Sequence, residues 1–173
     1  NNSKNKFLKF KKRFNKLKET KELYKKRDKF GEKELKEFSI LFLIINNLDI
    51  FRKNIELISE INFSTESLEE FKEKILKFSL NKKFFEKNKI EVEDFDQKFE
   101  HIIKNVNANA PIKVIASNKS EDEITTMFKE IIEEIKKIDL KQKIENLENK
   151  VSISLDESSY SELLSLRNQL KEG

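Results

Sequence analysis

Apolar residues recur at intervals of three and four along most of the chain, a spacing that places them on one face of a helix. Phenylalanine, isoleucine and leucine supply most of these positions, and lysine and glutamate fill many of the positions between them. Helices are predicted on this pattern over residues 5–27, 32–46, 48–59, 64–78, 92–106, 120–151 and 156–173. The pattern therefore favours an all-α protein in which each helix buries one face.

Capping residues mark where three of these helices begin. Ser64 and Asp156 each follow an apolar residue, and another apolar residue stands four positions after each of them. This arrangement predicts an N-cap with a hydrophobic staple around it. Ser120 and Glu123 have the spacing of a capping box, in which each side chain bonds to the backbone of the other residue.

The longest predicted helix carries two apolar stripes. The first stripe consists of Ile124, Phe128, Ile131, Ile135 and Ile138. The second stripe consists of Leu140, Ile144, Leu147 and Val151. At about 3.6 residues per turn the two stripes differ by roughly half a turn, so one surface cannot bury both. We predict that the first half packs on the preceding helices and that the second half pairs with the last helix.

These observations predict an all-α fold in which a multi-helix bundle is followed by a long helix and a C-terminal antiparallel helical hairpin. The predicted units are a basic leader over residues 1–31, a bundle over 32–118, and the long helix with its hairpin over 119–173. Two helices alone bury little apolar surface, so we expect the hairpin to offer a binding surface.

Composition narrows the range of folds and sites. Two glycines and one proline are too few for the tight turns of a small β-protein or for a glycine-rich phosphate loop. The absence of cysteine excludes disulfides and thiolate metal sites, and it agrees with a cytoplasmic location. The longest apolar run, residues 40–45, is far shorter than the ~20 residues that cross a bilayer, so no membrane partner is expected.

The net charge of +4 conceals an uneven distribution. Residues 1–36 contain 15 lysine and arginine residues against 5 acidic ones, whereas the rest of the chain is mildly acidic. In the leader Lys9, Lys12 and Arg13 alternate with phenylalanines, and their charge would attract phosphates. A solvated linker would have the same composition, so both interpretations of the leader stay open.

Residues that could carry catalysis are sparse. The single histidine, His101, has no identifiable acidic partner, which favours a surface or structural role. The acidic cluster of Glu91, Glu93, Asp94 and Asp96 lacks the glycine and the ligand spacing of a calcium loop. The sequence also lacks the signature motifs of nucleotide-binding loops, zinc proteases and serine hydrolases. We therefore expect a non-enzymatic chain with no cofactor, metal or small-molecule substrate.

Two stretches together resemble one protein family. The first lies in residues 34–76 and contains LFLIINNLDIFRKNIELISEINFSTESLEEFKEKIL. The second, residues 144–173, is IENLENKVSISLDESSYSELLSLRNQLKEG. Their order and spacing resemble the C-terminal helicase-binding domain of DnaG-type bacterial replicative primases. The chain departs from the family at Asp49, where a proline is common, and at Met127 or Phe128, where a tryptophan is common.

The resemblance implies a non-catalytic domain of a primase, a DNA-directed RNA polymerase. This domain would dock on the N-terminal domain of the replicative DNA helicase and couple priming to unwinding. The hairpin would supply the main contact, and its candidate residues are Ile144, Leu147, Tyr160, Leu163, Leu164, Arg167 and Leu170. Family members also contact the acidic C-terminal tail of single-stranded-DNA-binding protein through basic residues of the bundle.

Two other functions stay open on the sequence. A basic helical nucleic-acid-binding protein, led by residues 4–27, would bind DNA with a steep dependence on salt. The candidate contacts for nucleic acid or for an acidic tail are Lys9, Lys12, Arg13, Lys33 and Lys36. A fragment of a lysine-rich helical surface lipoprotein would instead bind a host protein, and a lipobox encoded upstream would identify it.

Overall fold

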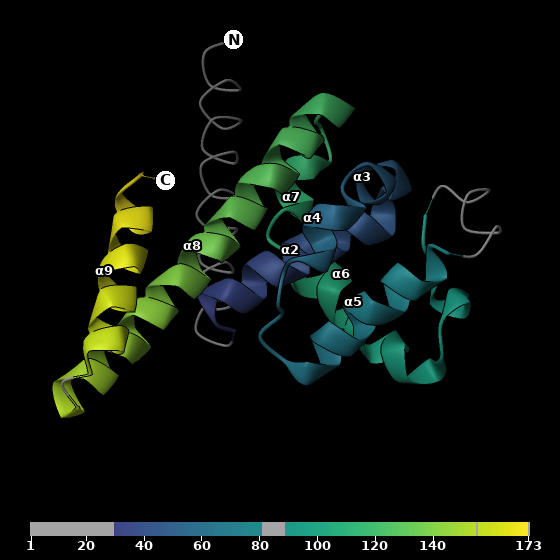
Figure 1. Ribbon diagram of the computed structural model, residues 1–173. Helices are drawn as coiled ribbons and strands as arrows, with labels where there is room; N and C mark the ends of the chain where they lie inside the picture. Colours follow the sequence, from purple (N-terminus) through teal and green to yellow (C-terminus); the bar gives the residue numbers. More distant parts are fainter. Residues whose placement is uncertain (1–29, 81–88, 155, 173) are drawn as a thin grey trace, which may run out of the picture.

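The computed structural model describes residues 30–80, 89–154 and 156–172, and the regular elements within these ranges are helices (Figure 1). In chain order they are α2 (Glu32–Asn46), α3 (Leu48–Lys53), α4 (Ile55–Ser59), α5 (Glu66–Phe78), the short 3-10 helices η2 (Val92–Asp94) and η3 (Gln97–Phe99), α6 (Glu100–Asn109), α7 (Lys113–Ala116), α8 (Glu121–Ile153) and α9 (Glu157–Glu172). The predicted all-α class is confirmed. The helix predicted over residues 5–27 lies outside the described residues.

Helix α2 forms the centre of the bundle because it contains the longest apolar run of the chain, residues 40–45, which covers every face of the helix. Residues 37–45 are all buried except Phe42, so the helix is enclosed on almost every side. Helices α3, α6 and α8 pack against it. Burying one large apolar side chain contributes about 1.5–3 kcal/mol relative to exposure, so this enclosed helix contributes much of the driving force for folding.

The single helix predicted over residues 48–59 is divided into α3 and α4 at Asn54. The side-chain amide of Asn54 donates a hydrogen bond of 2.8 Å to the carbonyl oxygen of Ile50. In a continuous helix that carbonyl would accept the main-chain N–H of Asn54. The N–H bonds instead to the carbonyl oxygen of Phe51 at 3.1 Å. Competition between the asparagine side chain and the backbone therefore ends α3 here.

The helix predicted over residues 92–106 begins later than expected, because η2, an extended Asp96 and η3 precede α6. In this irregular segment Phe95 and Phe99 both contact Phe71 of α5, with ring centroids at 5.3 and 5.4 Å. Aromatic rings in such tilted and edge-on arrangements contribute more than their buried area alone. Packing against α5 therefore outweighs the local preference for helix.

The connection between α4 and α5 is fastened to the core by a buried carboxylate. Oε1 of Glu37 accepts hydrogen bonds from the main-chain N–H and the hydroxyl of Ser64, at 2.7 and 2.8 Å. Because Ser64 is engaged there, Thr65 caps α5, and the cap predicted at Ser64 is wrong by one residue. Burial raises the pKa of Glu37, and the two hydrogen bonds from Ser64 oppose that rise only in part.

Two side chains of α5, Glu69 and Lys72, also bind the backbone of the connection between α4 and α5. Nζ of the buried Lys72 donates to the carbonyl oxygen of Ile61 at 2.6 Å and pairs with Glu69 at 2.6 Å. The second carboxylate oxygen of Glu69 accepts the main-chain N–H of Phe63 at 2.8 Å. Charged side chains of α2 and α5 thus supply hydrogen-bond partners to backbone N–H and C=O groups of the connection. Backbone groups that are buried away from water need such partners.

Helix α8 begins with the predicted capping box. The Ser120 hydroxyl accepts the main-chain N–H of Glu123 at 3.4 Å, and the Glu123 carboxylate accepts the main-chain N–H of Ser120 at 3.0 Å. A lysine in the preceding turn, Lys119, bonds to the same carboxylate at 2.5 Å. These bonds satisfy amides that the first turn of a helix leaves unpaired, so the prediction is confirmed.

We expect the carboxyl of Glu123 to titrate with a pKa of about 2, because Lys119 and then Ser120 stabilise its charged form. The pKa in the folded state lies below the ordinary value of 4.5. The stabilisation is therefore present above the ordinary pKa and is lost as the pH falls toward 2. A carbon-13 NMR titration of the Glu123 carboxyl measures this pKa. Ser120→Ala should raise it, and a wild-type value near 4.5 would contradict the capping box.

The two halves of α8 contact different elements, as the change of apolar register predicts. Phe128, Ile132 and Ile135 are buried in the bundle core, and α2 packs on this half. Ile144 is buried in the second half, along which α9 folds back in the antiparallel sense (Figure 1). Helix α8 begins at Glu121, two residues after the predicted unit boundary at 118–119. The first half of α8 nevertheless belongs to the packing of the bundle.

Candidate interaction surface

The hairpin of α8 and α9 turns at a capped helix start. The carboxylate of Asp156 accepts the main-chain N–H groups of Ser158 and Ser159 at 3.3 and 3.1 Å, and the hydroxyl of Ser159 at 2.6 Å. These bonds, the Ser159 hydroxyl first, lower the pKa of Asp156. The cap predicted at Asp156 is therefore confirmed, and it sets the point at which α9 begins.

The contact between the two helices of the hairpin buries few side chains. Ile144 of α8 and Leu163 of α9 are buried, together with Ser159. Leu147 and Leu170, also among the predicted partner contacts, are half-buried. Four of the predicted residues therefore serve, wholly or partly, to hold the hairpin together. A hairpin with so few fully buried side chains depends on its junction with the bundle for stability.

The other predicted residues of the hairpin face solvent. Tyr160 and Leu164 are 52% and 44% exposed and lie one turn apart on α9. Arg167 follows on the same side, and its guanidinium pairs with Glu148 of α8 at 2.7 Å. An exposed aromatic and aliphatic pair beside an arginine has the composition of a protein-binding surface. Tyr160 and Leu164 are thus the predicted residues that a partner could cover.

The two basic candidates in the bundle tie α2 to α8. Nζ of Lys33 lies 2.5 Å from the carboxylate of Asp139 and 3.9 Å from that of Glu37. Lys36 forms an ion pair with Glu134. Because both ammonium groups already face carboxylates, they do not form a free basic surface for an acidic tail. The remaining basic candidates, Lys9, Lys12 and Arg13, lie outside the described residues.

An apolar groove between α2, α7 and α8 was not predicted from the sequence. Its apolar lining consists of Leu35, Pro111, Ile112, Ile115 and Ile131. Val114 and Ile115 of α7 are 59% and 52% exposed. The available signal was the apolar residues Ile112, Val114 and Ile115 that follow Pro111, but no helix was predicted there.

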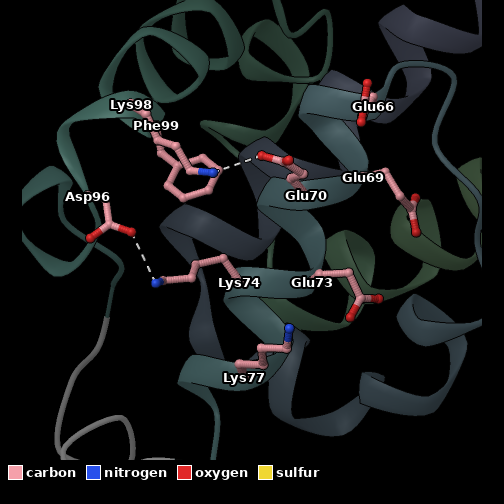
Figure 2. Close-up of a pocket in the computed structure, with 9 residues that line it drawn as sticks. All are labelled: Glu66, Glu69, Glu70, Glu73, Lys74, Lys77, Asp96, Lys98 and Phe99. Atoms are coloured by element: carbon pink, nitrogen blue, oxygen red, sulfur yellow. Dashed lines mark hydrogen bonds and ion pairs between the residues drawn. The ribbon is translucent and has the colours of Figure 1, made fainter.

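A second hollow lies between α5 and η3 and is lined almost entirely by charged residues (Figure 2). Lys98 bonds to Glu70 at 2.9 Å and stands 4.7 Å from the ring centroid of Phe99. Lys74 bonds to Asp96 at 3.1 Å (Figure 2). The lining consists of carboxylates, lysines and one phenylalanine, and its ion pairs join the two walls. These ion pairs hold η3 against α5.

The remaining polar candidates lie on the surface. His101 is exposed on α6, and its Nε2 lies 3.1 Å from Nδ2 of Asn105. The carboxylate of Asp94 accepts the main-chain N–H of Glu91 at 2.9 Å. Within the described ranges, histidine, aspartate and glutamate side chains form no group of three that could hold a metal ion. The helices of the same ranges include none with the length and apolar character that crossing a membrane requires.

Comparison with known proteins identifies no relative of this chain. A search found no matching family model, no matching curated protein and no matching solved structure. Function is therefore inferred from the residues and surfaces described above.

Proposed function

We propose that this chain is the non-catalytic interaction domain of a bacterial primase, which docks on the N-terminal domain of the replicative helicase in the cytoplasm. The observation that carries the proposal is the exposed pair of Tyr160 and Leu164 on a projecting hairpin. The resemblance of residues 34–76 and 144–173 to the helicase-binding domain of primases supports it.

The proposed mechanism is the burial of one helix face against another. Phe128, Ile132 and Ile135 anchor the first half of α8 in the bundle, so the second half continues outward as the same helix. Figure 1 shows α9 on the side of α8 that faces away from the bundle, where a partner could approach it. Helices of the helicase domain would then complete a larger bundle with α8 and α9.

We expect Leu164→Ala and Tyr160→Ala each to weaken binding of the helicase N-terminal domain by about 2 kcal/mol, roughly thirtyfold in Kd, as truncated interface anchors do. Calorimetry with the intact chain and the helicase domain of the same organism measures this change. Helicity should stay near that of the wild type, because both side chains are substantially exposed.

Leu80→Ala is the matched control, because Leu80 is 84% exposed and follows α5 of the bundle. Its affinity for the helicase domain should equal that of the wild type.

Point variants are preferable to deletion of residues 120–173, since that deletion removes Phe128, Ile132 and Ile135 from the core. An intact, folded chain that does not bind at tens of micromolar would overturn the proposal. Salt-sensitive binding to DNA would then favour the basic leader as the functional element.

A further inference from the structure

Helix α9 carries a second stripe in addition to the one that faces α8. The inner stripe consists of Ser159, Leu163, Leu166 and Leu170, which are buried or half-buried. The outer stripe consists of Glu157, Tyr160, Leu164, Arg167 and Lys171, which are all exposed. Its members recur at alternating steps of three and four residues, the spacing of a coiled-coil seam. The outer stripe is rotated from the inner one by about 100°, just over a quarter of a turn.

The outer stripe has an ordered distribution of charge. It begins with the acidic Glu157, continues through the apolar Tyr160 and Leu164, and ends with the basic Lys171. Arg167, the remaining member, has its charge paired with Glu148 of α8 in the same chain. Glu157 and Lys171 are equally far from Leu164, about 10 Å along the helix in each direction. Among the described residues, neither Glu157 nor Lys171 has an ion-pair partner. The stripe is therefore complementary to a reversed copy of itself.

We propose that the outer stripe binds a second copy of this chain, with the two α9 helices antiparallel and a two-fold axis passing beside Leu164. Glu157 of each copy then faces Lys171 of the other copy, and the Tyr160 and Leu164 side chains pack across the axis. Such a contact is closed, because the same patch is used on both copies. A parallel pairing would set Glu157 against Glu157 and Lys171 against Lys171, which is repulsive.

The position of α9 leaves room for a second copy. Among the described elements, α8 separates α9 from the bundle (Figure 1). Because Tyr160 and Leu164 also carry the proposed helicase contact, the second copy and the helicase domain would exclude one another. The dimer itself does not rest on the helicase proposal, since it uses only the chain's own residues.

Sedimentation equilibrium of the full chain over a wide concentration range tests the dimer. The wild type should be in a monomer–dimer equilibrium, and Leu164→Asp should abolish it at every accessible concentration. Lys171→Glu should raise the dissociation constant on the order of tenfold, because it turns two exposed attractions into repulsions. The double variant E157K/K171E restores opposite charges across the axis and should recover most of the wild-type affinity.

Leu80→Asp is the control for adding a charge at an exposed apolar position, and it should leave the dissociation constant unchanged. Circular dichroism shows whether each variant keeps its helices. A wild type that stays monomeric at the highest concentration would overturn the dimer, whether or not the chain binds the helicase. A dimer that Lys171→Glu does not weaken, or that the double variant does not restore, would overturn the antiparallel pairing. Dimer formation without helicase binding would leave this inference intact and contradict only the proposed function.

Discussion

Phe128→Ala should lower the free energy of unfolding by about 3–5 kcal/mol, the usual cost of emptying a phenylalanine site in a core. The Phe128 side chain has no exposed surface and lies within the core that α2, α5 and α6 share with α8. Because α8 is one continuous helix, the loss should also weaken the anchor that positions the hairpin. Urea denaturation followed by circular dichroism measures the change in the free energy of unfolding.

Ile153→Ala is the matched control for that experiment. Ile153 lies on the same helix, but its side chain is 87% exposed. We expect its substitution to change the free energy of unfolding by no more than about 0.5 kcal/mol, as surface substitutions usually do. Equal effects of the two substitutions would show that α8 does not share the core of the bundle.

Lys72→Met should lower the free energy of unfolding by about 1–3 kcal/mol, although it replaces a buried charge with an apolar side chain of similar length. The substitution removes the hydrogen bond of 2.6 Å to the carbonyl oxygen of Ile61 and the ion pair with Glu69. The carbonyl group then loses a donor inside the protein. Thermal and urea unfolding of the purified variant measure the loss.

Lys74→Met provides the comparison on the same helix. Lys74 also forms an ion pair, with Asp96 at 3.1 Å, but both side chains are largely exposed to water. Exposed pairs of this kind contribute at most about 1 kcal/mol, so Lys74→Met should be close to neutral. If Lys72→Met proves as stable as the wild type, the charged side chains around residues 61–65 do not hold that connection in place.

The difference between Lys72 and Lys74 also shows where sequence reasoning stops. Both are lysines on the amphipathic helix α5. Helical spacing places Lys72 beside the apolar face, between Leu68 and Ile75, and Lys74 on the polar face, but it does not show what the ammonium of Lys72 binds. In the structure Lys72 is buried, and its ammonium donates to the carbonyl oxygen of Ile61 in the 61–65 connection. Lys33 and Lys36 are a similar case. They were candidates for binding an acidic tail, but α8 brings Asp139 and Glu134 against them.

The sequence by itself determined the helical class, the positions of most helices, the caps at Ser120 and Asp156, and the change of register within α8. These features depend on contacts between residues a few positions apart, which periodicity and cap chemistry describe directly. The predicted list of hairpin residues was likewise drawn from helical spacing on two helices, α8 and α9. It could not separate Ile144 and Leu163 from Tyr160 and Leu164, because all four are apolar and recur at helical spacing.

Only the tertiary structure decided which of those residues are buried, which residue caps α5, and where α6 begins. Each of these outcomes depends on a side chain far away in sequence. Glu37 binds Ser64, so Thr65 caps α5 instead. Phe95 and Phe99 pack against Phe71, and the segment that contains them is not a regular α-helix. Helix α9 packs on α8 through Ser159 and Leu163, which leaves Tyr160 and Leu164 in solvent. Long-range contacts set these outcomes because burying an aromatic ring, or giving a buried carboxylate its hydrogen bonds, is worth more than the small differences in helix propensity between neighbouring start positions.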